Sequence, residues 1–157
     1  MRDSWNRKAL GELVIGKGEY GINAAACDYN PKLHTYLRIT DISEDGRFLE
    51  HGKKSVNHVE ANKFVLKEGE ITFARTGAST GKTYLYNRND GKLVFAGFLI
   101  RFKPDPEKLH PPFLKYITQS YYYKNWVSIW SARTGQPGIN GNEFALFEFN
   151  LPQLPQQ

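Results

Sequence analysis

The stretch LKEGEITFARTGASTGKTYLY, residues 66–86, decides how this chain folds. After a glycine turn at Gly69, the β-branched and aromatic side chains of residues 71–75 predict a strand. Residues 82–87 alternate in character and predict a second strand. The glycine-rich loop between them therefore connects two neighbouring strands of a sheet.

The loop is similar to the phosphate-binding loop of nucleotide hydrolases, which requires a glycine, four residues, and then Gly-Lys-Ser or Gly-Lys-Thr. Here GASTGKT, residues 77–83, is one residue too short, and Thr76 stands where the first glycine is needed. A strand follows, so no helix N-terminus would point at a phosphate. We therefore expect no nucleotide hydrolysis, and any phosphates at this loop are expected to be those of a nucleic acid.

Outside this stretch, local patterns predict one helix and further strands. Apolar residues at helical spacing after Pro111 and Pro112 predict a long helix over about 111–130. The other expected elements are a strand at 35–39 leading to a tight turn at 44–46, a helical turn at 59–64, a strand at 92–102, a glycine-rich loop at 131–144 and a last strand at 145–151. Together they predict an α+β fold: a mainly antiparallel twisted sheet or partial barrel, one long packed helix and short helical turns.

Composition places the chain among folded globular proteins. Its 157 residues fit one domain, and 40% of them are hydrophobic. No apolar run is long enough for a membrane helix, and the polar N-terminus is unlike a signal peptide. The single cysteine, Cys27, excludes an internal disulfide, and the four histidines lack the paired spacing of a zinc site. We expect a soluble, cytoplasmic protein without a bound metal.

Positive charge is concentrated between residues 71 and 140. The whole chain has 21 Lys and Arg against 16 Asp and Glu, a net charge of +5. Residues 71–140 alone contain ten of the basic residues and three of the acidic ones. Such a local excess indicates an anionic partner, most simply a nucleic acid.

Two motifs resemble catalytic sites without meeting their requirements. HPPF, residues 110–113, has a histidine where the amino-methyltransferase motif has the Asp, Asn or Ser that accepts from the target amino group. Asp105, Glu107 and Lys108 lie too close together for the separated carboxylates of a nuclease metal site. We therefore expect no catalytic residues and no cofactor in this chain.

Taken in order, the motifs resemble the target recognition domain of type I restriction-modification specificity (S) subunits. The most diagnostic is the Gly-Ala-Ser-x-Gly-Lys core at 77–82, and the terminal LPQLPQQ is similar to the family's Pro-x-Pro-Pro-x-x-x-Gln ending. The other matching stretches are KALGEL at 8–13, YLRITDISEDGRF at 36–48, FAGFLIRFKP at 95–104, SYYYKNWV at 120–127 and SARTGQPGINGNEF at 131–144. The resemblance covers essentially the whole chain.

The resemblance implies a non-catalytic domain that reads one half of a split target in double-stranded DNA. In such complexes separate methyltransferase (M) and restriction (R) subunits carry the chemistry, so S-adenosylmethionine, ATP and Mg are expected only on those partners, in a prokaryotic cytoplasm. Family members continue into a spacer helix, whereas this sequence stops at Gln157. Residues 1–157 are therefore expected to be a single target recognition domain without that helix.

Candidate DNA-contacting side chains lie in the polar loops. In the glycine-rich loop these are Arg75, Ser79, Thr80 and Lys82, mainly for phosphates, with the N–H groups of Gly77 and Gly81 able to join them. The alternative is that this loop only shapes the fold around its glycines. The candidates for base reading are Lys17, Glu19, Tyr20 and Asn23 in the first loop, Arg47, His51, Lys53, Lys54 and Asn57 after the hairpin, and Arg133, Thr134 and Gln136 in a third loop.

Two further questions stay open at the level of sequence. The aromatic residues of the predicted helix either pack in the core at helical spacing or stack on an extruded base; they are Tyr121, Tyr122, Tyr123, Trp126 and Trp130. The alternatives to DNA recognition are an interaction domain that docks on the M subunit with little DNA binding alone, an RNA-binding module, and a nuclease.

Overall fold

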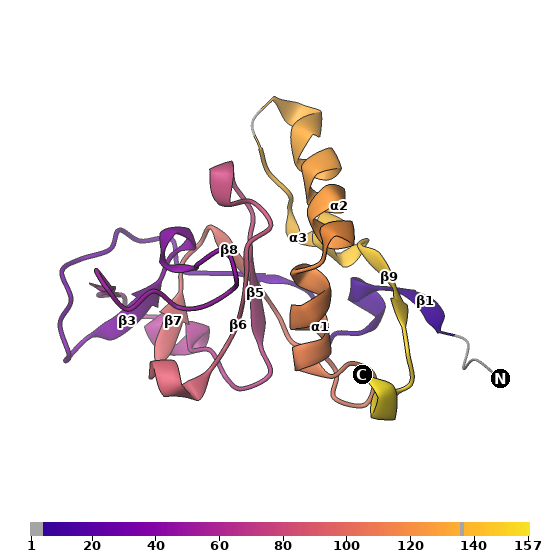
Figure 1. The fold of residues 1–157 in the computed structure, drawn as a ribbon. Helices are drawn as coiled ribbons and strands as arrows, with labels where there is room; N and C mark the ends of the chain where they lie inside the picture. Colours follow the sequence, from indigo (N-terminus) through magenta and orange to yellow (C-terminus); the bar gives the residue numbers. More distant parts are fainter. Residues whose placement is uncertain (1–4, 136) are drawn as a thin grey trace.

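The computed structural model describes residues 5–135 and 137–157. Figure 1 shows a three-stranded sheet at the left, a four-stranded sheet in the middle, two helices beside it and a two-stranded ribbon at the right. The α+β prediction is confirmed, and the sheets do not close into a barrel. No helix in the described part of the chain is long and apolar enough to cross a lipid bilayer.

The central sheet is antiparallel, with the strand order β2-β8-β5-β6. Its strands are β2 (Glu19–Tyr20), β8 (Leu99–Phe102), β5 (Ile71–Ala74) and β6 (Thr83–Leu85). β5 and β6 pair from Ile71 opposite Leu85 to Phe73 opposite Thr83, so the predicted strand–loop–strand element is confirmed. Every residue of β5 and β8 is buried, as expected for strands with nearly continuous apolar sequences.

The run predicted as one long strand at 92–102 is divided between two sheets. β7 (Leu93–Phe95) belongs to a three-stranded sheet with β3 (His34–Leu37) and β4 (Lys54–Val56), in the order β4-β3-β7. In this sheet β3 and β7 run parallel, while β3 and β4 run antiparallel. A turn closed by the Leu99 N–H, which donates to the Ala96 carbonyl at 3.0 Å, then leads the chain into β8. The apolar pattern does not reveal this break because both halves of the run are buried.

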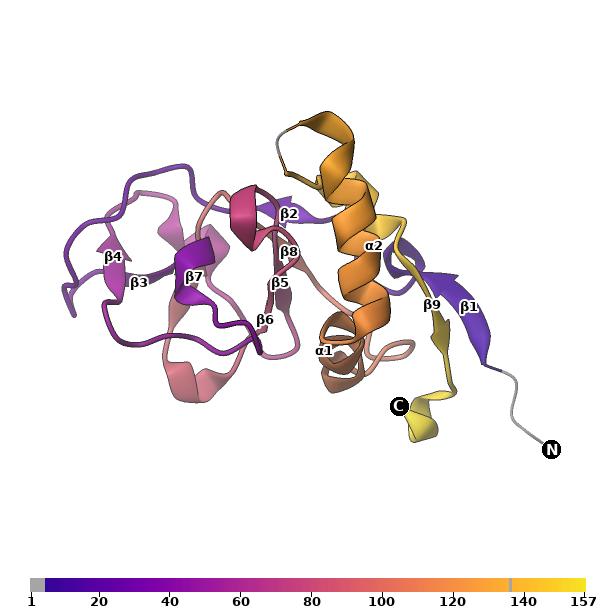
Figure 2. The ribbon, with the colours of Figure 1, turned by 45° about the horizontal axis from the view of Figure 1, so that its top comes forward.

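The segment predicted as one helix at 111–130 forms two helices that flank the central sheet (Figure 2). They are α1 (Pro111–Thr118) and α2 (Tyr121–Ser131). Ser120 Oγ accepts the Tyr123 N–H at 3.2 Å and caps the start of α2. The main chain is extended at Ser120, with a ψ of 154°, and this residue interrupts the helix. The buried positions are Leu114, Thr118, Tyr123 and Val127, so the buried face shifts by one residue there.

The two ends of the described chain meet. β1 (Asn6–Ala9) pairs antiparallel with β9 (Glu148–Leu151). Just before β9, α3 (Gly141–Ala145) occupies part of the segment predicted as a glycine-rich loop. Asn140 Oδ1 accepts the Glu143 N–H at 2.8 Å and Glu143 Oε1 accepts the Asn140 N–H at 3.0 Å. This capping box starts α3 although its first residue, Gly141, disfavours a helix.

The helical turn predicted at 59–64 is present as η3, one of several short 3₁₀ turns in the described chain. They are η1 (Leu10–Glu12), η2 (Ile39–Asp41), η3 (Ala61–Phe64), η4 (Gly77–Ser79), η5 (Arg88–Asp90), η6 (Ala132–Thr134) and η7 (Leu154–Gln156). The tight turn predicted at 44–46 is closed where the Arg47 carbonyl accepts the Ser43 N–H at 2.9 Å, and Gly46 adopts a φ of 79°. This turn requires a glycine because its φ lies in the left-handed region.

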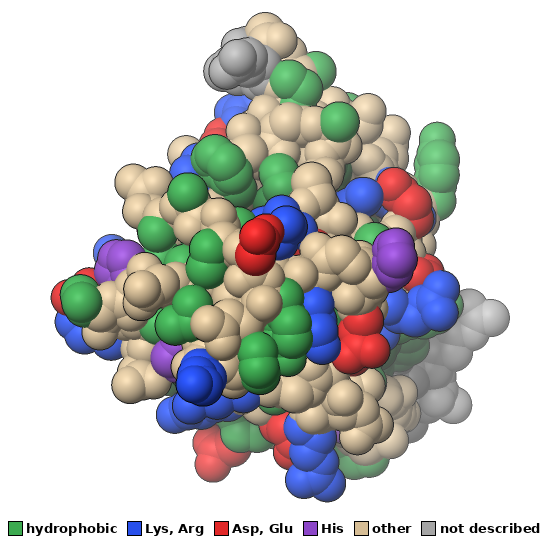
Figure 3. All heavy atoms as spheres, turned by 90° about the vertical axis from the view of Figure 1, so that its left-hand side faces the viewer, with side chains coloured by type: hydrophobic (Ala, Val, Ile, Leu, Met, Phe, Trp, Pro, Cys, Tyr) green, Lys and Arg blue, Asp and Glu red, His purple; other side chains and the backbone are tan. Residues whose placement is uncertain are grey.

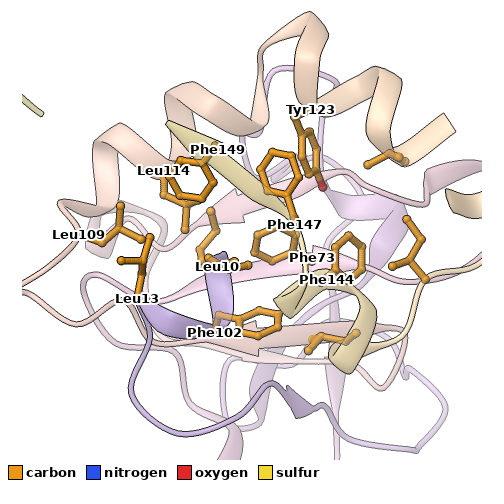
Figure 4. Packing of buried hydrophobic residues seen from close by; sticks show 14 residues of the cluster. Leu10, Leu13, Phe73, Phe102, Leu109, Leu114, Tyr123, Phe144, Phe147 and Phe149 are labelled. Carbon is orange, nitrogen blue, oxygen red and sulfur yellow. The ribbon is translucent and has the colours of Figure 1, made fainter. Parts of the chain in front are cut away.

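The largest hydrophobic cluster lies between the central sheet and the helices (Figure 4). Phe73 of β5 lies at its centre, with ring centroids 5.4 Å from Phe102 and 4.9 Å from Phe144. Tyr123 is 1% exposed, and Trp126 packs against the same cluster. Tyr121, by contrast, is 83% exposed. The α2 aromatics that point inward therefore pack in the core.

Candidate nucleic-acid interface

The glycine-rich loop directs main-chain N–H groups inward. The Gly77 N–H donates to the Pro137 carbonyl at 3.1 Å, and the Gly81 N–H donates to the Ala74 carbonyl at 2.8 Å. Neither of these groups, both candidates for phosphate binding, is therefore free. The φ angles of 69° at Gly77 and 94° at Gly81 allow this turn. A phosphate-binding loop is different, since its N–H groups converge on the anion.

Helix α2 packs directly against this loop. The Tyr123 hydroxyl donates to the Gly81 carbonyl at 2.7 Å, and burial raises the pKa of Tyr123 well above its usual value. A Cβ atom on Gly81 would lie 2.6 Å from Cγ1 of Val127. An open cavity of about 380 Å³ remains between the loop and α2, with Glu44, Lys82 and Lys124 among its lining residues.

Polar side chains of the loop also make contacts within the domain. Lys82 Nζ lies 3.3 Å from a Glu44 carboxylate oxygen and 3.4 Å from the Ile42 carbonyl, and its side chain is 24% exposed. The Thr80 hydroxyl donates to the Gly77 carbonyl at 2.7 Å. Ser79 is partly exposed. These contacts hold the loop against its neighbours.

Arg75, at the end of β5, has different surroundings. Its guanidinium carbon lies 5.2 Å from the ring centroid of Tyr20 and 5.3 Å from that of Phe98. Its Nε donates to the Gly97 carbonyl at 2.9 Å. No carboxylate within residues 5–135 and 137–157 forms an ion pair with Arg75. An arginine next to two rings and without a counter-ion is available to an external acceptor.

The first loop, the glycine-rich loop and the third loop meet around Arg75. The Arg75 carbonyl accepts the Ile139 N–H at 3.0 Å, and Thr76 forms an isolated bridge with Gly138. The Tyr20 hydroxyl accepts the Gly141 N–H at 3.1 Å. Long-range contacts thus bring together Tyr20, which the structure places in β2, Arg75 of the glycine-rich loop and the end of the third loop.

The other candidates of the first loop and of the region after the hairpin are spread over the surface. Lys17 and Asn23 are exposed. Arg47 Nε lies 2.8 Å from an Asp45 oxygen, and Lys54 Nζ lies 3.1 Å from an Asp28 oxygen. Lys53 Nζ lies 4.6 Å from the ring centroid of Tyr29. The candidates found by sequence therefore include both ion-paired and unpaired cations.

Arg133 of the third candidate loop is ion-paired. It contacts the Glu143 carboxylate, and its Nε donates to the Trp130 carbonyl at 2.8 Å. Its guanidinium carbon also lies 4.4 Å from a ring centroid of Trp130. Gln136 lies outside the described residues, and for Thr134 only the main chain is described.

The comparisons with known proteins agree on one family. Residues 2–157 match the model of the type I restriction modification DNA specificity domain. The chain belongs to this family. It is 27% identical to the type I restriction enzyme StySPI specificity subunit of Salmonella potsdam, over 98% of this chain and 34% of that subunit. The specificity domain described here thus spans about a third of the length of that relative.

Solved structures share the fold of this specificity domain. The HsdS subunit from Thermoanaerobacter tengcongensis matches with a TM-score of 0.70 at 17% identity, over 99% of this chain and 40% of that one. A chain from a study of complex assembly and conformational transition of the type I R-M system matches with a TM-score of 0.71 at 19% identity, over 98% and 39%. The S subunit from M. genitalium matches with a TM-score of 0.61 at 11% identity, over 96% and 36%.

Two residues that matter in the specificity domain were missed by sequence reasoning. Phe98 is 54% exposed beside Arg75, although it was placed inside a predicted buried strand. Arg101, counted in the basic excess, is only 4% exposed and pairs with Glu19 and Glu70. Arg101 therefore contributes nothing to a cationic surface. No local signal marks either residue, because the apolar run at 92–102 contains both.

The surface charge of the specificity domain is mixed. On the face in Figure 3, Lys and Arg side chains lie among acidic and hydrophobic ones and do not form one continuous basic patch. Glu19 is an example from the first loop, where it lies 3.2 Å from Lys103 Nζ. Burial alone would raise the pKa of Glu19, but the hydrogen bonds and charges of Arg101 and Lys103 lower it overall. Among the described residues, no group of three or more His, Cys, Asp or Glu is placed to hold a metal ion.

Proposed function

We propose that residues 1–157 form one target recognition domain that binds double-stranded DNA and reads one half of a split target. In this role the chain is the non-catalytic specificity component of a type I restriction-modification complex, with M and R subunits as partners. S-adenosylmethionine, ATP and Mg would be bound by those subunits. The observation that carries the proposal is the match of residues 2–157 to the DNA specificity domain family.

The arrangement of side chains supports a division of labour on DNA. Exposed cations without a carboxylate partner, such as Lys17, are suited to phosphates, and their binding releases counterions. The group of Tyr20, Asn23 and Arg75 offers hydrogen-bonding groups on a framework of paired strands, as base reading requires. Arg47, Lys54, Lys82 and Arg133 already have carboxylate partners and are expected to contribute less.

Lys17→Ala is expected to weaken binding to all duplexes alike and to reduce the slope of log K against log salt concentration by about 0.9, the value for one lost phosphate contact. The measurement is fluorescence anisotropy with duplexes of several sequences over a range of NaCl concentrations. Lys63→Ala is the matched control, because Lys63 is a surface lysine paired with Glu60 at 3.0 Å. Equal slopes for the wild type and Lys17→Ala would remove Lys17 from the interface.

The proposal as a whole is tested by selection of bound duplexes from a random DNA pool, followed by competition with duplex RNA. We expect one short sequence to be enriched and DNA to be preferred. If the purified chain enriches no sequence even at low salt, with or without an M subunit, the proposed function is wrong.

A second candidate function is docking on a methyltransferase subunit. The observation that favours it is a set of exposed large apolar side chains on α1 and α2, namely Tyr116 at 71%, Tyr121 at 83% and Ile129 at 61% exposed. Such residues are typical of protein interfaces. We expect co-elution with an M subunit in size-exclusion chromatography without DNA, and its loss in a Tyr121→Ser/Ile129→Ser variant. Unchanged co-elution of that variant would place the contact elsewhere.

A further inference from the structure

The surroundings of Arg75 suit one kind of acceptor better than others. We propose that Arg75 reads a guanine base of the target through a bidentate contact from its terminal nitrogens. This inference rests on the proposed function. In this arrangement Tyr20 and Phe98 are positioning residues, which hold the guanidinium in the plane required. The proposal names the base that one residue recognises and goes beyond general DNA binding.

The contacts of Arg75 leave one edge of its guanidinium available. The rings of Tyr20 and Phe98, at 5.2 and 5.3 Å, limit its movement, and Nε is used by the Gly97 carbonyl at 2.9 Å. The two terminal nitrogens have no hydrogen-bond or ion-pair partner among the described residues and remain for an external acceptor. Two parallel N–H donors match the O6 and N7 acceptors of guanine, which lie side by side on the major-groove edge of that base.

The two rings are held in place by main-chain contacts. A Cβ atom on Gly21 would lie 2.2 Å from the Ala96 carbonyl oxygen, so only glycine allows the first loop to approach the turn that carries Phe98. The Gly97 N–H donates to the Ile22 carbonyl at 2.7 Å, and the Arg75 N–H donates to the Phe98 carbonyl at 3.0 Å. These bonds fix the position of Phe98 relative to Arg75.

The partner strand and the third loop fix the other ring. Tyr20 lies opposite Ile100 in the β2–β8 pair, and its hydroxyl accepts the Gly141 N–H at 3.1 Å. Because the side chain of Arg75 is already ordered, little conformational entropy remains to be lost when it binds a base. Its fixed plane also means that only an acceptor pair in the same plane is bound well.

The surface around Arg75 can admit a base edge. An open cavity of about 500 Å³ adjoins it, and Tyr20, Asn23, Tyr36, Arg38 and Phe98 are among the lining residues. Phe98 is 54% exposed and Tyr20 is 46% exposed. A ligand that covers both rings and binds the arginine would explain why the rings are exposed and why the arginine has no carboxylate partner among the described residues. A phosphate can also accept two N–H groups of an arginine, but it offers oxygens in several directions and so does not require one fixed plane of the guanidinium.

The repeated tetrapeptide Ala-Arg-Thr-Gly provides an internal comparison. It occurs at 74–77 and again at 132–135. Arg133, in the second copy, also lies beside an aromatic ring, but it pairs with Glu143. The two arginines thus have the same neighbours in sequence. Among the described residues, the terminal nitrogens of Arg75 contact no carboxylate, whereas Arg133 contacts that of Glu143. Arg133→Ala is consequently the matched control for Arg75→Ala.

The test begins with the duplex that the wild-type chain selects from a random pool. Each guanine of that duplex is replaced in turn by 7-deazaguanine, which keeps base pairing and lacks the N7 acceptor. We expect one position to weaken wild-type binding by about 3- to 10-fold, as loss of half of a bidentate contact predicts. In Arg75→Ala and Arg75→Lys, the overall affinity should fall by about 10- to 100-fold and the sensitivity to 7-deazaguanine at that position should disappear.

The variants separate base reading from contact with phosphate and from damage to the fold. Arg133→Ala should keep the full 7-deazaguanine penalty. Tyr20→Leu and Phe98→Leu should reduce this penalty while thermal unfolding shows a folded chain. The proposal is overturned if Arg75→Lys and Arg75→Ala retain the wild-type penalty, since Arg75 would then contact phosphate or no DNA at all. Failure of the wild-type chain to select any duplex would instead refute the proposed function.

Discussion

Arg101→Ala is expected to lower the free energy of unfolding by about 3–5 kcal/mol, because it leaves a buried carboxylate without its partner. Arg101 is 4% exposed, and its terminal nitrogens lie 3.3 Å from both Glu70 and Glu19. The same nitrogens donate to the main-chain carbonyls of Val65 at 3.0 Å and Lys63 at 3.2 Å. One side chain thus joins β2 and β8 to η3 and the segment that follows it. Urea unfolding followed by circular dichroism measures the effect.

Lys103→Ala is the matched control for this change, since Lys103 pairs with the same Glu19 but its side chain is 41% exposed. Lys103→Ala should lower the free energy of unfolding by less than about 1 kcal/mol, as is usual for surface ion pairs. Replacing both Arg101 and Glu70 by methionine should recover part of the stability, because no unpaired charge is then buried. Equal effects of Arg101→Ala and Lys103→Ala would show that Arg101 is not the structural centre of this network.

Gly81→Ala is expected to lower the free energy of unfolding by about 2–5 kcal/mol through two separate effects. The φ of 94° at Gly81 is unfavourable for any residue with a side chain, at a cost of about 1–2 kcal/mol. The new methyl group would lie 2.6 Å from Cγ1 of Val127, and overpacking of this kind costs typically about 1–3 kcal/mol. Thermal unfolding monitored by calorimetry measures the loss.

Gly77→Ala separates the two effects. Gly77 also has a positive φ, of 69°, but a Cβ atom there meets nothing within 4 Å. Gly77→Ala should therefore lower the free energy of unfolding only by the conformational cost of about 1–2 kcal/mol. In Gly81→Ala/Val127→Ala the smaller side chain makes room for the methyl group, so the double variant should be more stable than the sum of the single changes predicts. Full additivity would mean that packing against α2 does not require Gly81.

These expectations bear on the role of the glycine-rich loop. Gly81 packs on α2, the N–H groups of Gly77 and Gly81 donate to main-chain carbonyls, and Lys82 pairs with Glu44. Those contacts support a structural role for this half of the loop. Arg75, at its start, remains the cation suited to an external acceptor. The structural reading of the loop is thus supported for Gly77, Gly81 and Lys82, whereas a DNA contact by Arg75 stays a proposal.

Local patterns predicted a large part of the fold. Strands β5 and β6 with their connecting loop follow from a glycine turn and a period of two, and the α+β class follows from the order of elements. A helical, apolar segment at 111–130 was also predicted, although Ser120 divides it into two helices and Tyr116 and Tyr121 are largely exposed. The break between β7 and β8 was not predictable, because the two halves of one apolar run pair with strands of different sheets. Strand pairing is decided by residues far apart in the sequence.

What the sequence by itself determined is the family, the strand–loop–strand element and the unsuitability of its loop for a nucleotide, since motifs, spacing and residue counts are local properties. Only the tertiary structure decided which cations are available. Arg75 and Arg133 occur in identical tetrapeptides, yet Glu143 pairs with one, and Tyr20 and Phe98 flank the other. Arg101, in turn, is buried against Glu19 and Glu70. The charge that an arginine presents to a partner depends on the carboxylates and rings beside it, and the fold brings those from distant parts of the chain.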